Sequence, residues 1–321
     1  MGPNAKGALL ALLSFGLYAT HDLIVKGLGA TYSPFQIVFF SVLFSFPLVV
    51  GMLISDSRPG HLRPNHPWWT ALRTVAAVTT AAAAFYAFSN LPLAQVYAII
   101  FAAPLIITIL SIPILGEQVR LRRWMAVIMG LGGVIVVLRP GVTQFDLAHL
   151  AALVAAFGSA LASIIVRKIG NDERPEVLVL YPMLTNFVVM GALTAFVYVP
   201  MPLEHLALNA TMAVLGFAAS MIIIYAYKAA EAVIVAPMQY SQILWAVVFG
   251  AAFFDEWPDR VTLAGAAIII ASGVYIVLRE GSGGASENTP VLQNRGRYET
   301  GTLPRVSTLL RLRKDRSKAQ S

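Results

Sequence analysis

The chain has 321 residues, of which 58% are hydrophobic and only 12% are charged, and it contains no cysteine. A soluble globular domain carries about a quarter charged residues, so the composition excludes a water-soluble domain and places the chain in a lipid bilayer. The lack of cysteine excludes disulfides, thiol catalysis and thiolate metal sites. The net charge of +7 is unevenly distributed along the sequence.

Apolar segments follow one another along almost the whole chain, separated by short polar breaks. A helix needs about 20 mostly apolar residues to cross the bilayer, and backbone in lipid must satisfy its own hydrogen bonds. The sequence therefore predicts an all-α membrane protein with ten transmembrane helices and no cleavable signal peptide. The expected spans are residues 7–27, 34–54, 68–89, 95–115, 121–138, 147–168, 176–199, 209–229, 232–254 and 261–279.

Lysine and arginine gather on one side of the predicted bundle. The loops on the other side hold only Lys26, Arg139 and Arg260. Since these residues stay with the cytoplasm, we expect both termini on the cytoplasmic side of a bacterial inner membrane. The loops on the expected cytoplasmic side carry Lys6, Arg58, Arg63, Arg120, Arg122, Arg123, Arg167, Lys168, Arg174 and Lys228.

Residues 282–321 differ from the rest because they are rich in Gly, Ser and Asn and then basic. This composition predicts a disordered cytoplasmic tail, with contact to anionic lipid as the alternative. We expect no nucleic acid partner, because the basic run lacks interleaved aromatic residues and a folded basic module.

The sequence contains an internal repeat with a spacing of about 140 residues. LALLSFGLYATHDLIVK (10–26) corresponds to AALVAAFGSALASIIVR (151–167), ILGEQ (114–118) to FFDEW (253–257), and GGVIVVLRPG (132–141) to SGVYIVLREG (272–281). Two units of five helices each are expected, at 1–141 and 142–281. Because five is odd, the second unit must start on the opposite face, which gives the inverted topology of many secondary transporters.

The ten spans, the repeat, the acidic GEQ and DEW elements and the Gly-rich segments that end in VLRPG and VLREG resemble the drug/metabolite transporter superfamily, in particular its EamA-type exporters. The resemblance covers residues 7–281. It implies export of small metabolites, most of all aromatic amino acids and flat organic cations such as paraquat. It also implies a central cavity lined mainly by the first, third, fourth, sixth, eighth and ninth helices.

Aromatic, hydroxyl and amide side chains cluster on the helices that this resemblance places at the cavity. Aromatic rings stack on aromatic cargo and attract cations. The alternative is that these side chains only pack helices together. The candidate substrate-binding residues are Tyr18, His21, Thr79, Tyr86, Tyr97, Phe101, Ser163, Tyr225, Met238, Gln242 and Trp245.

The first span contains three ionisable residues in the stretch SFGLYATHDLIVKG (14–27). Asp22 and Lys26 are four residues apart, which predicts an ion pair at the outer rim. His21 shares a face with Tyr18 and is expected to point into the cavity. Neighbours on a helix point about 100° apart, so His21 and Asp22 are not expected to form a catalytic dyad.

Pro104 and Pro237 occupy nearly equivalent positions in the two repeats. A proline removes one helical hydrogen bond and kinks the axis. We expect either hinges for alternating access or static kinks at these two positions.

Other classes of protein lack their characteristic sequence features. The chain has no HExxH motif, no paired-carboxylate cluster and no GxxxxGK[ST] loop, so we expect no enzymatic activity, metal or cofactor. An intramembrane enzyme and a channel are the alternatives from other classes. Facilitated diffusion is the expected mode of transport because buried acids are scarce, and proton-coupled antiport is the alternative.

Overall fold

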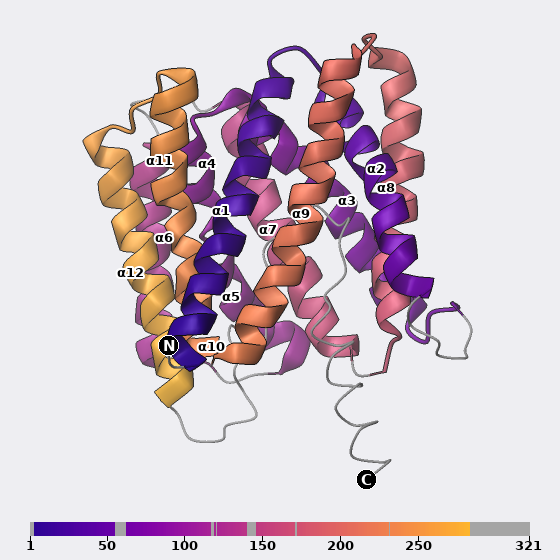
Figure 1. Cartoon of the computed structure of the whole chain (residues 1–321). Helices are drawn as coiled ribbons and strands as arrows, with labels where there is room; N and C mark the ends of the chain where they lie inside the picture. Colours follow the sequence, from indigo (N-terminus) through magenta and orange to yellow (C-terminus); the bar gives the residue numbers. More distant parts are fainter. Residues whose placement is uncertain are drawn as a thin grey trace.

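The computed structural model describes residues 3–54, 62–116, 119, 121–139, 146–170, 172–230 and 232–282. All the regular elements in these ranges are helices (Figure 1). They are α1 (Pro3–Gly29), α2 (Pro34–Ile54), α3 (Pro67–Asn90), α4 (Leu93–Ile100), α5 (Ala103–Leu115), α6 (Leu121–Leu138), α7 (Leu147–Ile169), α8 (Pro175–Val197), α9 (Leu203–Ala229), α10 (Ala232–Val235), the 3₁₀ helix η1 (Ala236–Tyr240), α11 (Ser241–Phe254) and α12 (Arg260–Ser282). The predicted tail beyond residue 282 lies outside the described residues.

The prediction of a helical membrane protein is confirmed. In the described part of the chain, seven helical segments are long and apolar enough to cross a bilayer, among them Leu93–Leu115, which joins α4 and α5. Two further apolar helices are shorter, Trp124–Leu138 and Arg260–Ile276. The remaining predicted span, 232–254, is divided among α10, η1 and α11.

Two of the predicted spans are interrupted, where the sequence predicted continuous helices. The span at 95–115 breaks between Ile100 and Ala103, and the span at 232–254 passes through the 3₁₀ turn of η1. Pro104 lies in the first turn of α5, and Pro237 lies in the first turn of η1. Proline has no N–H to donate, so it fits the start of a helical segment better than its interior.

The two interrupted spans also end alike. α5 is followed by Gly116 with φ 72°, and α11 is followed by Asp255 with φ 55°. Both residues are in the left-handed region, which ends a helix by turning the chain out of its axis. They begin the GEQ and DEW elements, so the sequence similarity of these elements corresponds to a similarity in backbone conformation.

Helices from the two halves of the chain pair across the bundle. α1 packs along α9, α3 along α7, α2 along α8 and α6 along α12 (Figure 1). The α6–α12 contact is so close that a Cβ atom on Gly133 would lie 2.9 Å from the carbonyl oxygen of Gly265. Small residues allow such close backbone approach between helices in a membrane.

The bundle has two ends, which we call proximal and distal. The proximal end holds the start of α1, at the bottom of Figure 1, and the distal end is opposite. Polar contacts tie each end together. At the proximal end Lys168 Nζ donates to the carbonyl of Ile114 at 2.7 Å, and at the distal end the Tyr32 hydroxyl lies 2.6 Å from His205 Nδ1.

Candidate functional site

A cluster of buried polar side chains lies where α1, α4 and α11 meet. We call it the Asp22 cluster, and it consists of His21, Asp22, Tyr97 and Gln242. Each of these residues is 9% exposed or less. Burying polar groups is costly unless they bond to one another, so a polar cluster at this place needs an explanation beyond packing.

Asp22 is the centre of this cluster. One of its carboxylate oxygens lies 2.8 Å from Nδ1 of His21. The other accepts a short hydrogen bond from the hydroxyl of Tyr97. The amide of Gln242 in turn donates to the Tyr97 hydroxyl at 3.4 Å. The cluster thus links α1 and α4, which belong to the first half of the chain, to α11, which belongs to the second half.

Local structure explains how these side chains meet. α4 has only eight residues before the helix is interrupted, and Tyr97 lies in this short helix. Gln242 lies in the first turn of α11, just after η1. Both side chains therefore lie next to an interruption of their span.

Aromatic rings surround the cluster. Phe85 of α3 meets the His21 ring edge-on at a centroid distance of 6.1 Å, and Phe88 meets Tyr97 at 5.4 Å. Phe101 lies 5.8 Å from Tyr97 and 5.1 Å from Tyr240. An acid inside an aromatic shell suits a flat or cationic solute, because ring faces attract cations.

The predicted Asp22–Lys26 pair is wrong. Lys26 Nζ lies 2.8 Å from Glu256 Oε1, donates to the carbonyl of Leu91 at 2.6 Å and sits 5.1 Å from the centre of the Phe254 ring. Both Asp22 and Lys26 are buried, at 2% and 7% exposure. The i,i+4 rule considers only one helix, whereas the partners of Lys26 come from the turn between α3 and α4, from the last residue of α11 and from the turn after it.

His21 and Asp22 were expected to point apart, and the structure brings their side chains into contact instead. Side-chain torsions bridge the angular offset between neighbouring positions. The Tyr18 hydroxyl lies 2.6 Å from Ser220 Oγ of α9, and the expectation that Tyr18 and His21 face the cavity together stays a prediction.

The remaining predicted site residues are placed at several locations. Tyr97, Phe101, His21 and Gln242 come together. Trp245 is 39% exposed, lies against Gly16 of α1 and packs on Phe249. Met238 is partly buried against the apolar cluster that includes Tyr18, and Tyr86 and Ser163 are half-buried.

Thr79 and Tyr225 are exposed, Tyr225 to 57%. Thr80, the next residue, is buried on α3 at 2% exposure. The roles of Thr79 and Tyr225 in cargo binding stay predictions. Sequence reasoning left two residues out of the site, Asp22 and Glu256. An acid inside an apolar span and the acid of the DEW element were the available signals.

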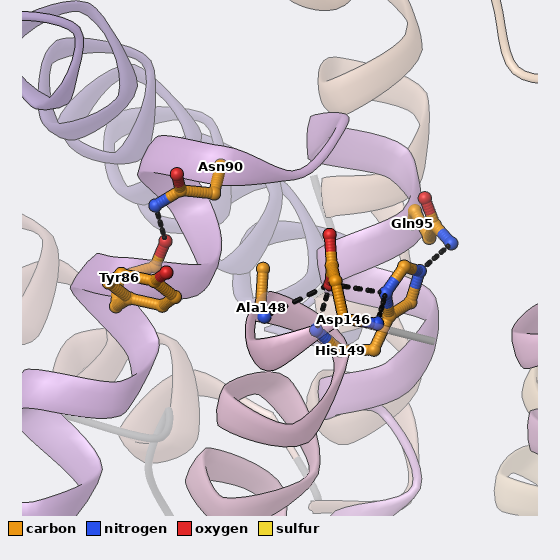
Figure 2. Close-up of polar contacts among 6 residues, drawn as sticks. All are labelled: Tyr86, Asn90, Gln95, Asp146, Ala148 and His149. Carbon is orange, nitrogen blue, oxygen red and sulfur yellow. Dashed lines mark hydrogen bonds and ion pairs between the residues drawn. The ribbon is translucent and has the colours of Figure 1, made fainter. Parts of the chain in front are cut away.

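A second polar group caps α7 at the distal end (Figure 2). The carboxylate of Asp146 accepts the N–H groups of Ala148 and His149 at 3.0 and 3.1 Å, and lies 2.6 Å from His149 Nδ1. The Gln95 amide of α4 lies 2.9 Å from His149 Nε2, which ties α4 to α7. Figure 2 also shows Asn90 donating to the carbonyl of Tyr86 at 2.8 Å, one turn back on α3.

Replacing Asp146 by alanine is expected to lower the free energy of unfolding by about 1 kcal/mol, because the first turn of α7 loses its cap. Partial burial raises the pKa of Asp146, but the hydrogen bonds from His149 and Ala148 outweigh it and hold the pKa below its ordinary value. The stabilisation is therefore complete above the ordinary carboxyl range and is lost as the pH falls through the lowered pKa. Thermal unfolding in detergent across acid pH measures both effects. Asp146→Asn, which also caps well, should keep most of the stability at neutral pH.

The helical architecture, the apolar spans and the polar cluster buried between the two halves define a multi-pass membrane protein built around an internal site. In the described part of the chain, no group of three or more His, Asp or Glu side chains could hold a metal ion. The sequence matches the model of the EamA-like transporter family twice, at residues 5–139 and 146–279. The chain belongs to this family of the drug/metabolite transporter superfamily, as its sequence features predicted.

Its relatives are named as transporters and not as enzymes. The S-adenosylmethionine uptake transporter of Rickettsia bellii is 27% identical over 272 residues, which cover 84% of this chain and 92% of that protein. The pseudopaline exporter CntI of Pseudomonas aeruginosa PAO1 is 24% identical, with 84% and 95% covered. The riboflavin transporter of Rhizobium johnstonii is 26% identical, with 75% and 78% covered.

Proposed function

We propose that this transporter exports small metabolites from the bacterial cytoplasm by alternating access, and that its cargo includes aromatic amino acids and flat cations such as paraquat. The observation that carries the proposal is the Asp22 cluster, a buried acid with phenol and amide partners inside an aromatic shell. Such a site can stack an aromatic ring and offer a carboxylate and hydrogen bonds to an ammonium group. The three relatives named above carry different substrate names, so the cargo of this chain has to come from its own site.

We assign the cargo site to side chains in and next to the cluster. Trp245 and Tyr18 extend it along α1, where Trp245 meets Gly16 and Tyr18 meets Ser220. The proposed lining is Tyr18, His21, Tyr97, Phe101, Met238, Gln242 and Trp245. Tyr86 and Ser163, which are half-buried, and Thr79 and Tyr225, which are exposed, are secondary candidates.

Alternating access requires two halves that can exchange roles, and we propose the repeats 1–141 and 142–281 as these halves. If α1 corresponds to α7, α2 to α8, α3 to α9 and α6 to α12, the pairing of α1 with α9 has its counterpart in that of α3 with α7. The pairings α2–α8 and α6–α12 are each their own counterpart. The rings of Phe101 and Tyr240, two residues that the repeat aligns, contact each other at a centroid distance of 5.1 Å. This pattern is expected for ten spans in two inverted repeats, with the breaks at Pro104 and Pro237 as hinges.

The proposed topology places the proximal end and both termini in the cytoplasm. The charge distribution supports it, because the distal loops carry only Lys26, Arg139 and Arg260. The natural chain has no cysteine, so single cysteines report the topology directly. In intact cells a membrane-impermeant maleimide should label Thr31→Cys, which is exposed at the distal end, and spare Leu62→Cys, which is 50% exposed at the proximal end. The reverse labelling pattern would exclude this orientation.

Liposome flux tests the function itself. Purified protein should release preloaded labelled tryptophan or paraquat with saturable kinetics, and unlabelled cargo on the opposite side should accelerate the release. These two properties distinguish a carrier from a channel, whose flux does not saturate in this way. Absence of flux for both probes would contradict the proposed cargo class.

A further inference from the structure

We propose that the carboxylate of Asp22 is a proton-binding site, and that its protonation couples a proton gradient to the opening of the distal end. This inference rests on the proposed alternating-access function. It also assigns a role to the one buried acid that the sequence analysis had paired with Lys26.

The first argument is the position of the carboxylate. Asp22 is 2% exposed within α1, in a segment that is long and apolar enough to cross the membrane. An ionisable group at such a place is a candidate for a proton relay. Its two oxygens are occupied by different elements, one by His21 of α1 itself and one by Tyr97 of α4.

The second argument is the asymmetry between the two ends of the bundle. α1 packs against α3, and α4 packs against α11. The repeat aligns α4 with α10 and η1, and α5 with α11. In the described part of the chain, the counterpart pairs, α7 with α9 and α5 with α10 and η1, make no comparable contact. The α1–α3 contacts lie at the distal end, where a Cβ atom on Gly29 would overlap the side chain of Ser89. The structure is therefore closed at the distal end.

The Asp22 cluster is part of this distal closure. It lies between α1, α4 and α11, so separation of these helices must break the Asp22–Tyr97 or the Tyr97–Gln242 hydrogen bond. Opening also lets water reach the carboxylate. The acid thus gains access to solvent in the same movement that removes its partners from the other helices.

The third argument is the hydrogen-bonding capacity of a carboxyl group. An ionised carboxylate only accepts hydrogen bonds, and here it accepts one from Tyr97 and contacts His21. A protonated carboxyl group carries an O–H donor and has lost part of its accepting capacity. Burial opposes the ionised form in the closed state, and we infer that the contacts with Tyr97 and His21 outweigh this cost. Ionised Asp22 then favours the closed distal end, and protonated Asp22 favours the open one.

The neighbouring charged and titratable groups leave this role to Asp22. α1 contributes His21 and Lys26, α4 contributes Tyr97, and the turn after α11 contributes Glu256. α11 faces the acid through the neutral amide of Gln242, and α3 through the ring of Phe85 beside His21. Lys26 is engaged by Glu256 at 2.8 Å, so that the two charges of this pair compensate each other.

The coupling follows from these two states. With the distal end open, Asp22 binds a proton from the distal side. When the proximal end opens, the proton leaves to the other side and the ionised acid binds Tyr97 again. If the distal side is external, each inward proton accompanies the return of the carrier that has released its cargo, which is proton-coupled antiport.

The test reads distal opening directly and needs no cargo. A single cysteine at Ser89→Cys, beside Gly29 in the α1–α3 contact, is labelled from the distal side with an impermeant maleimide at about pH 4, near the ordinary aspartate value, and at about pH 8, above the ordinary imidazole value. Labelling of the exposed Thr31→Cys corrects for the pH dependence of the reaction itself. We expect the corrected labelling of Ser89→Cys to rise severalfold at acid pH.

Asp22→Asn is expected to abolish this pH response and to label strongly at both pH values, since asparagine resembles the protonated acid. Tyr97→Phe, which keeps the ring, should also increase labelling at high pH. Asp146→Asn makes the same chemical change at a more exposed acid and should leave the response intact. An unchanged response in Asp22→Asn would overturn the proposal, as would a response that His21→Gln abolishes and Asp22→Asn does not.

Flux distinguishes failure of this inference from failure of the proposed function. If tryptophan or paraquat efflux is saturable but neither efflux nor labelling depends on the pH gradient through Asp22, only the proton site is wrong. If labelling depends on Asp22 but neither probe is transported, the proton site stands and the proposed cargo is wrong.

Discussion

Lys26→Met is expected to lower the free energy of unfolding by about 3–5 kcal/mol, because it leaves the carboxylate of Glu256 without its cation. The Lys26 side chain is 8% exposed and that of Glu256 is 26% exposed. Removal of one partner from a largely buried pair costs more than the pair itself contributes, since the remaining charge stays desolvated. Unfolding measured in bicelles, with and without the substitution, gives the difference directly.

The double variant Lys26→Met with Glu256→Met provides the internal control. It should recover most of the lost stability, because no uncompensated charge remains. The difference between the effect of the double variant and the sum of the two single effects gives the interaction energy of Lys26 with Glu256. Lys168→Met is the matched control at an exposed lysine, which sits 4.6 Å from the centre of the Trp69 ring. Its cost should stay near 1 kcal/mol or below. Equal losses in the free energy of unfolding for Lys26→Met and Lys168→Met would show that the buried Lys26–Glu256 pair stabilises the fold no more than an exposed lysine does.

The sequence predicted the helical spans well because they depend on composition over about twenty residues. Hydropathy and turn residues identify such segments without knowledge of their neighbours. The breaks at Phe101 and η1 could be anticipated from Pro104 and Pro237, although the spans were predicted as continuous. Here the lack of an N–H at each proline is a local property that the sequence shows directly.

The partners of the polar side chains could not be predicted in the same way. Asp22 meets Tyr97, 75 positions away in sequence, and Lys26 meets Glu256 from the far end of the other half. The local rule favoured the i,i+4 pair within α1, and tertiary contacts overrode it.

His21→Ala is expected to reduce transport of tryptophan or paraquat at least about tenfold in kcat/KM, equivalent to about 1.4 kcal/mol of transition-state binding. The imidazole contacts Asp22 at 2.8 Å and the edge of Phe85, so its loss removes one partner of the acid and opens a gap beside the aromatic shell. Both effects act on the place where cargo and proton are proposed to bind. Initial rates of efflux from liposomes over a range of internal concentrations separate kcat from KM.

The control for this substitution is His66→Ala, a histidine at the proximal end whose side chain is 41% exposed. It should transport at nearly the normal rate. His21→Gln is informative because the amide can donate to Asp22 while the imidazole ring is absent. If His21→Gln restores transport, the hydrogen bond to the acid is what matters. If His21→Ala transports as well as the unmodified chain at equal amounts in the membrane, His21 only fills space between α1 and α3, and the cargo site must lie nearer Trp245 and Tyr18.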